Sequence, residues 1–170
     1  KKINNWIQWQ PTTNFWTPKN ILEVWSRGVE TNSEIEWRIK EFKIKLNAMT
    51  NYVVSTNEKA TSQNDLSVNK QIIYVPMYSG FAKIGVMCKN ILLQYRQNYI
   101  SFRYTSADNT EFLNPYYLGN FYVSYLFESK KYQTNLFFQI NNVWNTNYQV
   151  VQNYAMPLQN FSTGININLN

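Results

Sequence analysis

The chain has 170 residues, a net charge of +6, no histidine and a single cysteine, Cys88. These counts exclude an internal disulfide, histidine-based metal sites and every catalytic scheme that uses an imidazole base. No other nucleophile and base stand together in the sequence, so we expect neither an enzyme nor a cofactor. Lysine and arginine are dispersed rather than gathered in one run, which argues against nucleic-acid binding.

Aromatic residues make up 17% of the chain, which favours strands over helices. No stretch reaches the ~18 consecutive apolar residues of a membrane-spanning helix. Alternation of apolar and polar residues instead predicts about eight strands. In chain order they cover 3–10, 20–37, 42–56, 77–88, 91–105, 115–127, 132–144 and 160–170.

The connections between these strands alternate in length. Long polar segments cover 11–19, 57–76, 106–114 and 145–159, and short turns lie near 38–41, 89–90 and 128–131. Long loops at one end and tight turns at the other are typical of an outer-membrane barrel, whereas soluble sandwiches mix loop lengths at both ends. The sequence therefore predicts an all-β, antiparallel transmembrane β-barrel. Its apolar face would meet lipid and its polar face would line the lumen.

Pairing across the first short turn supports this prediction. A two-residue turn at Ile39-Lys40 would place Trp37 opposite Phe42 on the apolar face. On the other face, Glu36 would lie opposite Lys43, and Glu34 opposite Lys45. Opposite charges that face each other across a hairpin stabilise it.

The other two short turns predict the same sidedness. A turn at Lys89-Asn90 would pair Cys88 with Ile91, and a turn at Ser129-Lys130 would pair Phe127 with Tyr132. Aromatic residues cluster near the latter turn, where the inner aromatic girdle of a barrel is expected.

Four stretches carry a family likeness: FWTPKNILEVWSRGVE (15–30), KQIIYVPMYSG (70–80), SADNTEFLNPYYLGNFYVSYLF (106–127) and INNVWNTNYQVVQNYAMPLQNFSTGININLN (140–170). They resemble the carboxyl-terminal third or so of the barrel of TonB-dependent outer-membrane receptors. The likeness is strongest to Bacteroidota members related to vitamin B12 and siderophore receptors. Its most specific part is the NNVWNTNY turn, followed by YAMP and an amphipathic final strand.

The resemblance implies a barrel of about 22 strands closed by an amino-terminal plug. Residues 1–170 would supply the last part of that barrel, without the plug. The family imports a scarce ligand, such as cobalamin or an iron-siderophore, using energy from the TonB–ExbB–ExbD complex. Expected partners are the rest of the barrel and the plug, outer-membrane lipid and a surface lipoprotein over the loops. Family members usually end on an aromatic residue, whereas this sequence ends on Leu169-Asn170.

Candidate site residues form three groups. Loop residues expected to contact a ligand or partner are Phe15, Trp16, Tyr74, Asp108, Glu111 and Tyr154. Charges expected to line the lumen are Glu34, Glu36, Lys43, Lys45, Lys83 and Arg96. A wetted face neutralised by the two glutamates is favoured over contact with the plug or an anionic ligand. Residues with an expected structural role are Gly28, Glu30, Asn141, Asn142, Asn145 and Tyr148.

The other two groups also have alternative interpretations. Asp108 and Glu111 lie close enough in sequence to hold Ca²⁺ with backbone oxygens, but a solvated loop is the expected interpretation. Gly28 interrupts the alternation of its strand, which predicts a bulge or close packing.

Two other architectures remain open at this point. A self-contained eight-stranded outer-membrane barrel has about this length, would have a structural or adhesive role, and would pair strand 160–170 with strand 3–10. A soluble carbohydrate-binding β-sandwich would bury the aromatic face instead. In the receptor, loop 57–76 is expected to lie outside the hydrogen-bonded wall, so that its deletion leaves the barrel folded.

Overall fold

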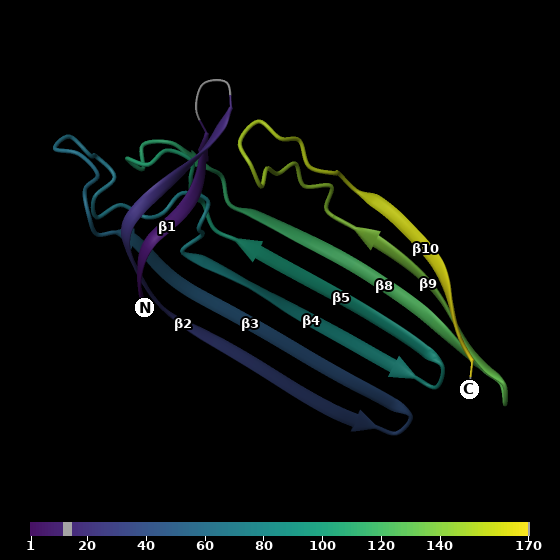
Figure 1. Ribbon diagram of the computed structural model, residues 1–170. Helices are drawn as coiled ribbons and strands as arrows, with labels where there is room; N and C mark the ends of the chain where they lie inside the picture. The colour runs from purple at the N-terminus through teal and green to yellow at the C-terminus, as the bar shows by residue number, and fades with distance from the viewer. Residues whose placement is uncertain (12–14, 170) are drawn as a thin grey trace.

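The computed structural model describes residues 1–11 and 15–169. Eight strands form one antiparallel sheet in the order β1-β2-β3-β4-β5-β8-β9-β10 (Figure 1). β6 and β7 form a separate two-stranded ribbon. The strands are β1 (Lys2–Pro11), β2 (Trp16–Ile39), β3 (Phe42–Asn57), β4 (Tyr78–Cys88), β5 (Ile91–Ile100), β6 (Arg103–Tyr104), β7 (Phe112–Leu113), β8 (Tyr116–Glu128), β9 (Tyr132–Asn141) and β10 (Asn160–Leu169). No helix in the described parts of the chain is long and apolar enough to cross a membrane.

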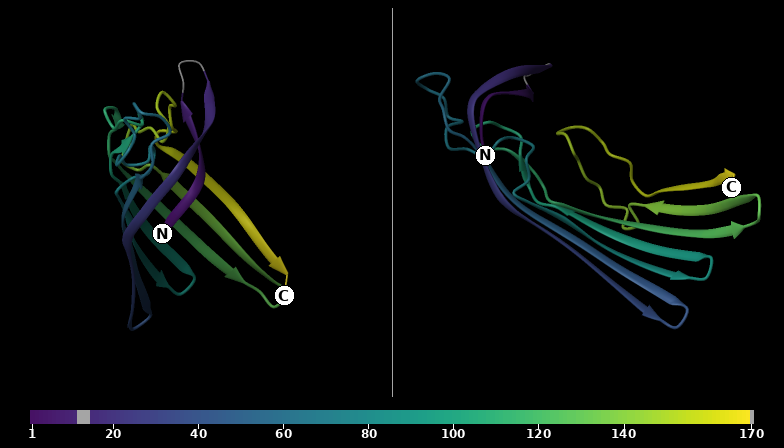
Figure 2. Two further views of the ribbon diagram at one scale, coloured as in Figure 1. Left: turned by 60° about the vertical axis from the view of Figure 1, so that its left-hand side comes forward. Right: turned by 60° about the horizontal axis from the view of Figure 1, so that its bottom comes forward.

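The sheet is open and curved, as both views in Figure 2 show. Within residues 1–11 and 15–169, β1 and β10 lie at opposite edges and do not pair with each other. A self-contained eight-stranded barrel requires that pairing, so the fold argues against this alternative. A sandwich needs a second sheet over the apolar face, and the ribbon of β6 and β7 is too small to provide one.

The two ends of the sheet differ as predicted. The short turns that join β2 to β3, β4 to β5 and β8 to β9 lie at one end (Figure 1). Residues 58–77, 101–115 and 142–159 lie at the opposite end, and we call them the loop layer. The predicted loop at 11–19 is wrong in its bounds, because Pro11 pairs with Trp16 and β2 begins at Trp16. Residues 12–14 lie outside the described part of the chain.

The predicted turn at Ile39-Lys40 is wrong by one position. Ile39 pairs with Phe42, which makes Lys40-Glu41 the turn and places Trp37 opposite Ile44. Lys40 has a φ of 54°, the positive value that tight hairpin turns require. The register is thus shifted by two residues from the predicted one, and a shift of two keeps every side chain on its predicted face.

Of the two remaining short turns, one lies where it was predicted and one is shifted. The turn at Lys89-Asn90 is confirmed, since Cys88 pairs with Ile91 and the ladder continues from there. The turn predicted at Ser129-Lys130 is wrong by one position, because Phe127 pairs with Thr134 and the Ser129 amide donates to the Tyr132 carbonyl. Here too the two-residue shift preserves the faces.

One face of the sheet is apolar and uncovered, and we call it the apolar face. It carries large side chains from each long strand, such as Trp37, Ile84 and Leu136, and Ile165 in β10 is 64% exposed. The buried apolar side chains lie elsewhere, in β2 near the loop layer and in the loop layer itself: Ile21, Val24, Ile72, Ile73 and Leu113. The core therefore lies under the loops, and the sheet itself presents apolar side chains outward.

At Gly28 the structure shows close packing and no bulge. The ladder between β2 and β3 runs without interruption from Val24–Asn57 to Ile39–Phe42. A Cβ on Gly28 would lie 2.1 Å from the Tyr52 carbonyl oxygen. Only glycine fits this approach of two backbones. Glu30 is exposed, and strand alternation places it on the same face as Glu34.

Candidate ligand-binding site

The loop layer is joined to the sheet by side-chain amides. Gln71 accepts a hydrogen bond from the Ser55 amide of β3 (2.9 Å). Asn109 in turn accepts one from the Gln71 amide and donates one to the Gln71 carbonyl, both at 2.9 Å. Segment 58–77 also forms isolated bridges to Thr56 and Asn57. The expectation that loop 57–76 lies outside the hydrogen-bonded wall is therefore wrong.

Asp65 organises the outer part of that segment. Its carboxylate accepts hydrogen bonds from the amides and hydroxyls of Thr61 and Ser67, at 2.5–2.9 Å. These donors hold the pKa of Asp65 well below its usual range, with the Ser67 hydroxyl contributing most. The ionised carboxylate thus replaces regular strand pairing in this turn.

Arg103 joins the other two segments of the loop layer. Its side chain rises from β6, and the residue is only 4% exposed. One guanidinium nitrogen donates to the carbonyls of Asn114 (3.4 Å) and Gln149 (3.0 Å), and the group lies 4.9 Å from the Tyr116 ring centre. Its Nε is buried without a hydrogen-bond partner among the described residues. A fixed cation therefore holds residues 101–115 against residues 142–159.

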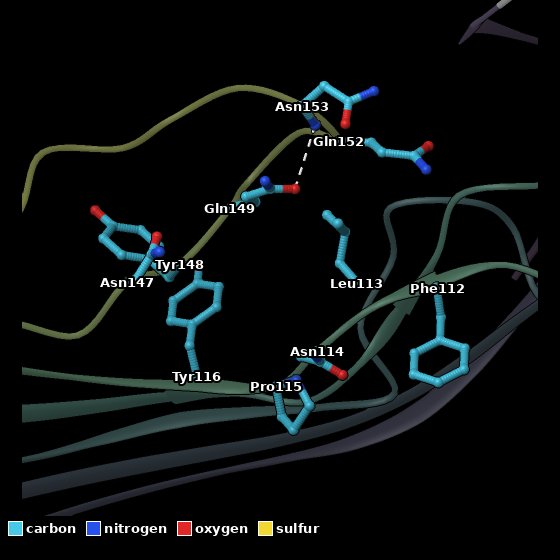
Figure 3. A pocket seen from close by; sticks show the side chains of 10 residues that line it. All are labelled: Phe112, Leu113, Asn114, Pro115, Tyr116, Asn147, Tyr148, Gln149, Gln152 and Asn153. Carbon is cyan, nitrogen blue, oxygen red and sulfur yellow. Dashed lines mark hydrogen bonds between the residues drawn. The ribbon is translucent and has the colours of Figure 1, made fainter.

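Between these two segments lies a pocket of about 400 Å³ (Figure 3). Tyr116 and Tyr148 lie close together in it, with ring centres 4.8 Å apart. Among the residues that the structure describes, the lining holds five side-chain amides and no charged side chain. The lining residues are Phe112, Leu113, Asn114, Pro115, Tyr116, Asn147, Tyr148, Gln149, Gln152 and Asn153. Amides and tyrosine rings suit a neutral ligand with hydrogen-bonding groups and a flat or apolar surface.

Of the loop residues singled out in the sequence, Trp16 and Tyr74 are brought together, with ring centres 5.8 Å apart. Tyr74 has a φ of 59°, and its hydroxyl is buried. Burial raises the pKa of that hydroxyl, and the nearby Gln152 backbone and then the positive charge of Arg103 oppose the rise. These contacts hold Trp16 and Tyr74 at the interface between β2 and the loop layer.

The other four singled-out loop positions do not gather into one site. Asp108 accepts hydrogen bonds from the amide and hydroxyl of Thr110, at 3.2 and 2.9 Å, as a turn residue. Glu111 and Tyr154 are exposed, and neither lines the pocket between the loops. Phe15 is 63% exposed. No group of three or more potential metal-ligating side chains occurs in the described residues.

The asparagines of the NNVWN turn make local hydrogen bonds. Asn142 is 4% exposed, has a φ of 51°, and exchanges hydrogen bonds with the amide and carbonyl of Thr146 at 2.9 and 2.8 Å. Asn145 accepts a hydrogen bond from the Gln159 amide (3.0 Å). Asn141 donates to Asn160 across the β9–β10 ladder (2.9 Å). The turn thereby positions Tyr148, whose hydroxyl pKa is raised by burial.

The charges expected in the lumen share one face of the sheet, which we call the polar face. Lys43 contacts Glu36 at 3.0 Å, and Lys45 contacts Glu34 at 2.6 Å. Lys83 and Arg96 are direct partners across β4 and β5, and Arg96 lies over the Phe81 ring at 3.9 Å. These two cations have no carboxylate within ion-pair distance in the described residues. The polar face is therefore neutralised on β2 and β3 and cationic on β4 and β5.

Three important loop residues were not singled out in the sequence. Arg103, Asn109 and Asp65 bridge positions up to 46 residues apart or stabilise an irregular turn. Asp65 has a visible signal, because Thr61 and Ser67 flank it at turn spacing. Arg103 has a weaker one, an isolated arginine between two aromatic residues in a polar segment. Asn109 lacks a distinguishing sequence pattern.

An open antiparallel meander with an uncovered apolar face, a charged opposite face and loops at one end is the wall of an outer-membrane barrel. A family model described as "TonB dependent receptor-like, beta-barrel" matches residues 1–143. The chain belongs to this family, which is one of receptors and not of enzymes. No curated protein matches the chain.

Two solved structures are similar in fold. BauA, the ferric preacinetobactin receptor from Acinetobacter baumannii, superposes with a TM-score of 0.69 at 16% identity, covering 94% of this chain and 25% of BauA. FyuA, the ferric yersiniabactin uptake receptor from Yersinia pestis, has a TM-score of 0.57 at 16% identity, covering 89% of this chain and 24% of FyuA. This chain therefore spans about a quarter of the length of either receptor. At 16% sequence identity, this structural similarity shows the fold alone.

Proposed function

We propose that this chain forms wall and loops of a TonB-dependent receptor that imports a scarce ligand across the bacterial outer membrane. The apolar face lies in lipid, the polar face lines the lumen, and the loop layer lies outside the cell. The rest of the barrel and a plug complete the receptor. The TonB–ExbB–ExbD complex acts through the plug, and a surface lipoprotein covers the loops. A barrel of 22 strands and a Bacteroidota source are parts of the same proposal.

The observation that carries the proposal is the pocket between the loops at the lumen end of the wall. Strand alternation places Tyr116 on the polar face of β8, together with Asn120, so the pocket has one wall on the side of the sheet that we assign to the lumen. Below it, Lys83, Arg96, Asn98 and Asn120 line a second, shallower hollow of about 450 Å³ on the polar face. A ligand captured between the loops would therefore move along a hydrogen-bonding wall.

The lining also bears on the choice between the two proposed ligands. An anionic ferric siderophore gains most from exposed cations, and no described residue places a charged side chain in the lining of the pocket. Cobalamin presents amide groups and a large flat ring, which suit five side-chain amides and two tyrosines. We propose a cobalamin-like neutral ligand first and a siderophore second. Lys83 and Arg96 then attract a plug carboxylate.

The test is uptake by cells in which the full receptor is the sole entry route. Replacing Tyr148 and Gln149 together by alanine should lower ligand affinity at least tenfold and slow uptake, because these side chains line the pocket while Arg103 contacts only the backbone of Gln149. Removing the TonB–ExbB–ExbD complex should stop uptake and leave binding intact.

The matched control reverses charge at the opposite end of the wall. Lys130→Glu lies in the short turn between β8 and β9 and should change neither binding nor uptake. Unchanged affinity in the pocket variant, together with loss of uptake in a folded Lys130→Glu receptor, would overturn the proposed orientation and the proposed site.

A further inference from the structure

The apolar face carries a groove close to the loop layer, separate from the pocket between the loops. Its floor is made of small residues in β3 and β4, where Ala48 pairs with Ala82 and Thr50 pairs with Gly80. Tyr78 and Tyr99 are among the residues that border it. The groove measures about 460 Å³, a size common for ligand sites.

The sequence of β3 and β4 explains why the face is hollow at this level. The next pairs toward the short turns are large, with Leu46 opposite Ile84. Toward the loops, Tyr52 and Tyr78 pack with ring centres 4.8 Å apart. The floor at Gly80 is closed by backbone, because a Cβ there would lie 2.4 Å from the Met49 carbonyl oxygen. Small residues between two levels of large ones leave a depression.

The groove opens on the apolar face, away from the lumen. The residues that β5 and β8 contribute to it, Gln97, Tyr99 and Tyr117, all lie on that face by strand alternation. Within the described part of the chain, its lining contains no charged side chain. Beside it, Trp144 extends from the NNVWN turn onto the apolar face and donates from Nε1 to the Tyr95 hydroxyl and to Gln97, each at 3.0 Å. Tyrosine and tryptophan with polar tips mark the level of lipid headgroups.

We propose that this groove binds one acyl chain of an outer-leaflet membrane lipid. The proposal rests on the membrane placement given above and is independent of the imported ligand. The groove is continuous with the large apolar side chains of the lipid-facing wall, it is uncharged, and it lies directly beneath a belt of paired tyrosines. A chain lying in it gains dispersion contacts with the floor that a freely moving neighbour lacks. A lipid held here would have a longer residence time than lipids elsewhere around the barrel.

The test is native mass spectrometry of the full receptor, extracted from outer membranes in a mild detergent and washed stepwise. Ala82→Phe places a ring in the groove, and Ala48→Phe fills it from the neighbouring strand. We expect wild type to retain one lipid more per receptor than either variant at the same wash. Heat-dependent gel mobility verifies that each variant forms a barrel.

The matched control is Val86→Phe, on the same face of the same strand but outside the groove. It should retain as many lipids as wild type. The proposal would be overturned if the folded Ala82→Phe and Ala48→Phe receptors retained as much lipid as wild type, or if Val86→Phe lost as much as they do. A wild-type mass showing a second copy of the receptor in place of lipid would also overturn it. Ligand uptake measured on the same variants separates the two proposals. If the groove variants alone lose the lipid while wild type takes up no ligand, the import proposal fails and the lipid proposal stands.

Discussion

The sheet and the loop layer are stabilised in opposite ways. In the sheet, apolar side chains point outward and the ladder supplies the regular backbone hydrogen bonds. In the loop layer, Arg103, Asn109 and Asn142 use side chains to satisfy backbone groups. In the proposed membrane placement the sheet depends on lipid as its solvent, whereas the loop layer depends on particular polar side chains. Each prediction below tests one side of this contrast.

The largest effect is expected from a charge on the apolar face. Leu136→Arg places a guanidinium at the middle of β9, where lipid cannot solvate it, and should cost about 2–4 kcal/mol of barrel stability. Asn135→Arg, one residue earlier and on the polar face, is the matched control and should cost far less. Urea unfolding in lipid vesicles measures both. Equal losses at the two positions would mean that the faces are assigned wrongly.

Close packing within the ladder gives the next effect. Gly28→Ala forces its new methyl group against the Tyr52 carbonyl, so the two strands must separate locally, at a cost of up to about 3 kcal/mol. At Gly85 in β4 a Cβ would meet its nearest neighbour, the Gln94 side chain, at 3.5 Å, an ordinary contact. Gly85→Ala should therefore leave the unfolding midpoint nearly unchanged. A Gly28→Ala receptor as stable as Gly85→Ala would show that the backbones do not approach as described.

Loss of the Arg103 side chain should destabilise the loop layer and leave the sheet unchanged. Arg103→Met keeps much of the side-chain volume but leaves the carbonyls of Asn114 and Gln149 without this donor, a local cost of about 1–2 kcal/mol. Hydrogen exchange should quicken in residues 101–115 and 142–159 and stay unchanged in β3 and β4. Arg38→Met, which removes an exposed arginine near a short turn, is the control. Faster exchange across the whole sheet would contradict a local role for Arg103.

The contrast between the sheet and the loop layer also explains which features could be predicted from the sequence. Strand identity, face and the position of the long loops follow from period-two alternation, because one face must suit lipid and the other water. Register is less determined, since a slip of two residues preserves the faces. At the first hairpin, the structure identifies the true turn by the Ile39–Phe42 pair and the positive φ of Lys40. In the loop layer, Arg103 and Asn109 act between segments whose proximity is set by the fold. Alternation carries no information about such contacts.

The smallest effect separates backbone register from side-chain pairing on the polar face. Glu36 lies directly opposite Lys45 across the β2–β3 ladder, yet Lys45 reaches diagonally to Glu34 at 2.6 Å and Lys43 reaches Glu36 at 3.0 Å. Diagonal neighbours across a ladder lie within reach of long side chains. The ion pairs predicted from the sequence are therefore present, although the register that predicted them is wrong.

A pair of double-mutant cycles measures this difference. The cycle of Glu34→Gln with Lys45→Met should give a small but measurable favourable coupling, because the two exposed side chains are in direct contact. The cycle of Glu36→Gln with Lys45→Met, on residues that face each other in the ladder, should give less, because Lys43 and Arg38 already contact Glu36. Both couplings should weaken at high salt. A larger coupling for Glu36 with Lys45 would mean that the side chains follow the backbone register and that the diagonal arrangement is wrong, while the lipid and lumen faces would be unaffected.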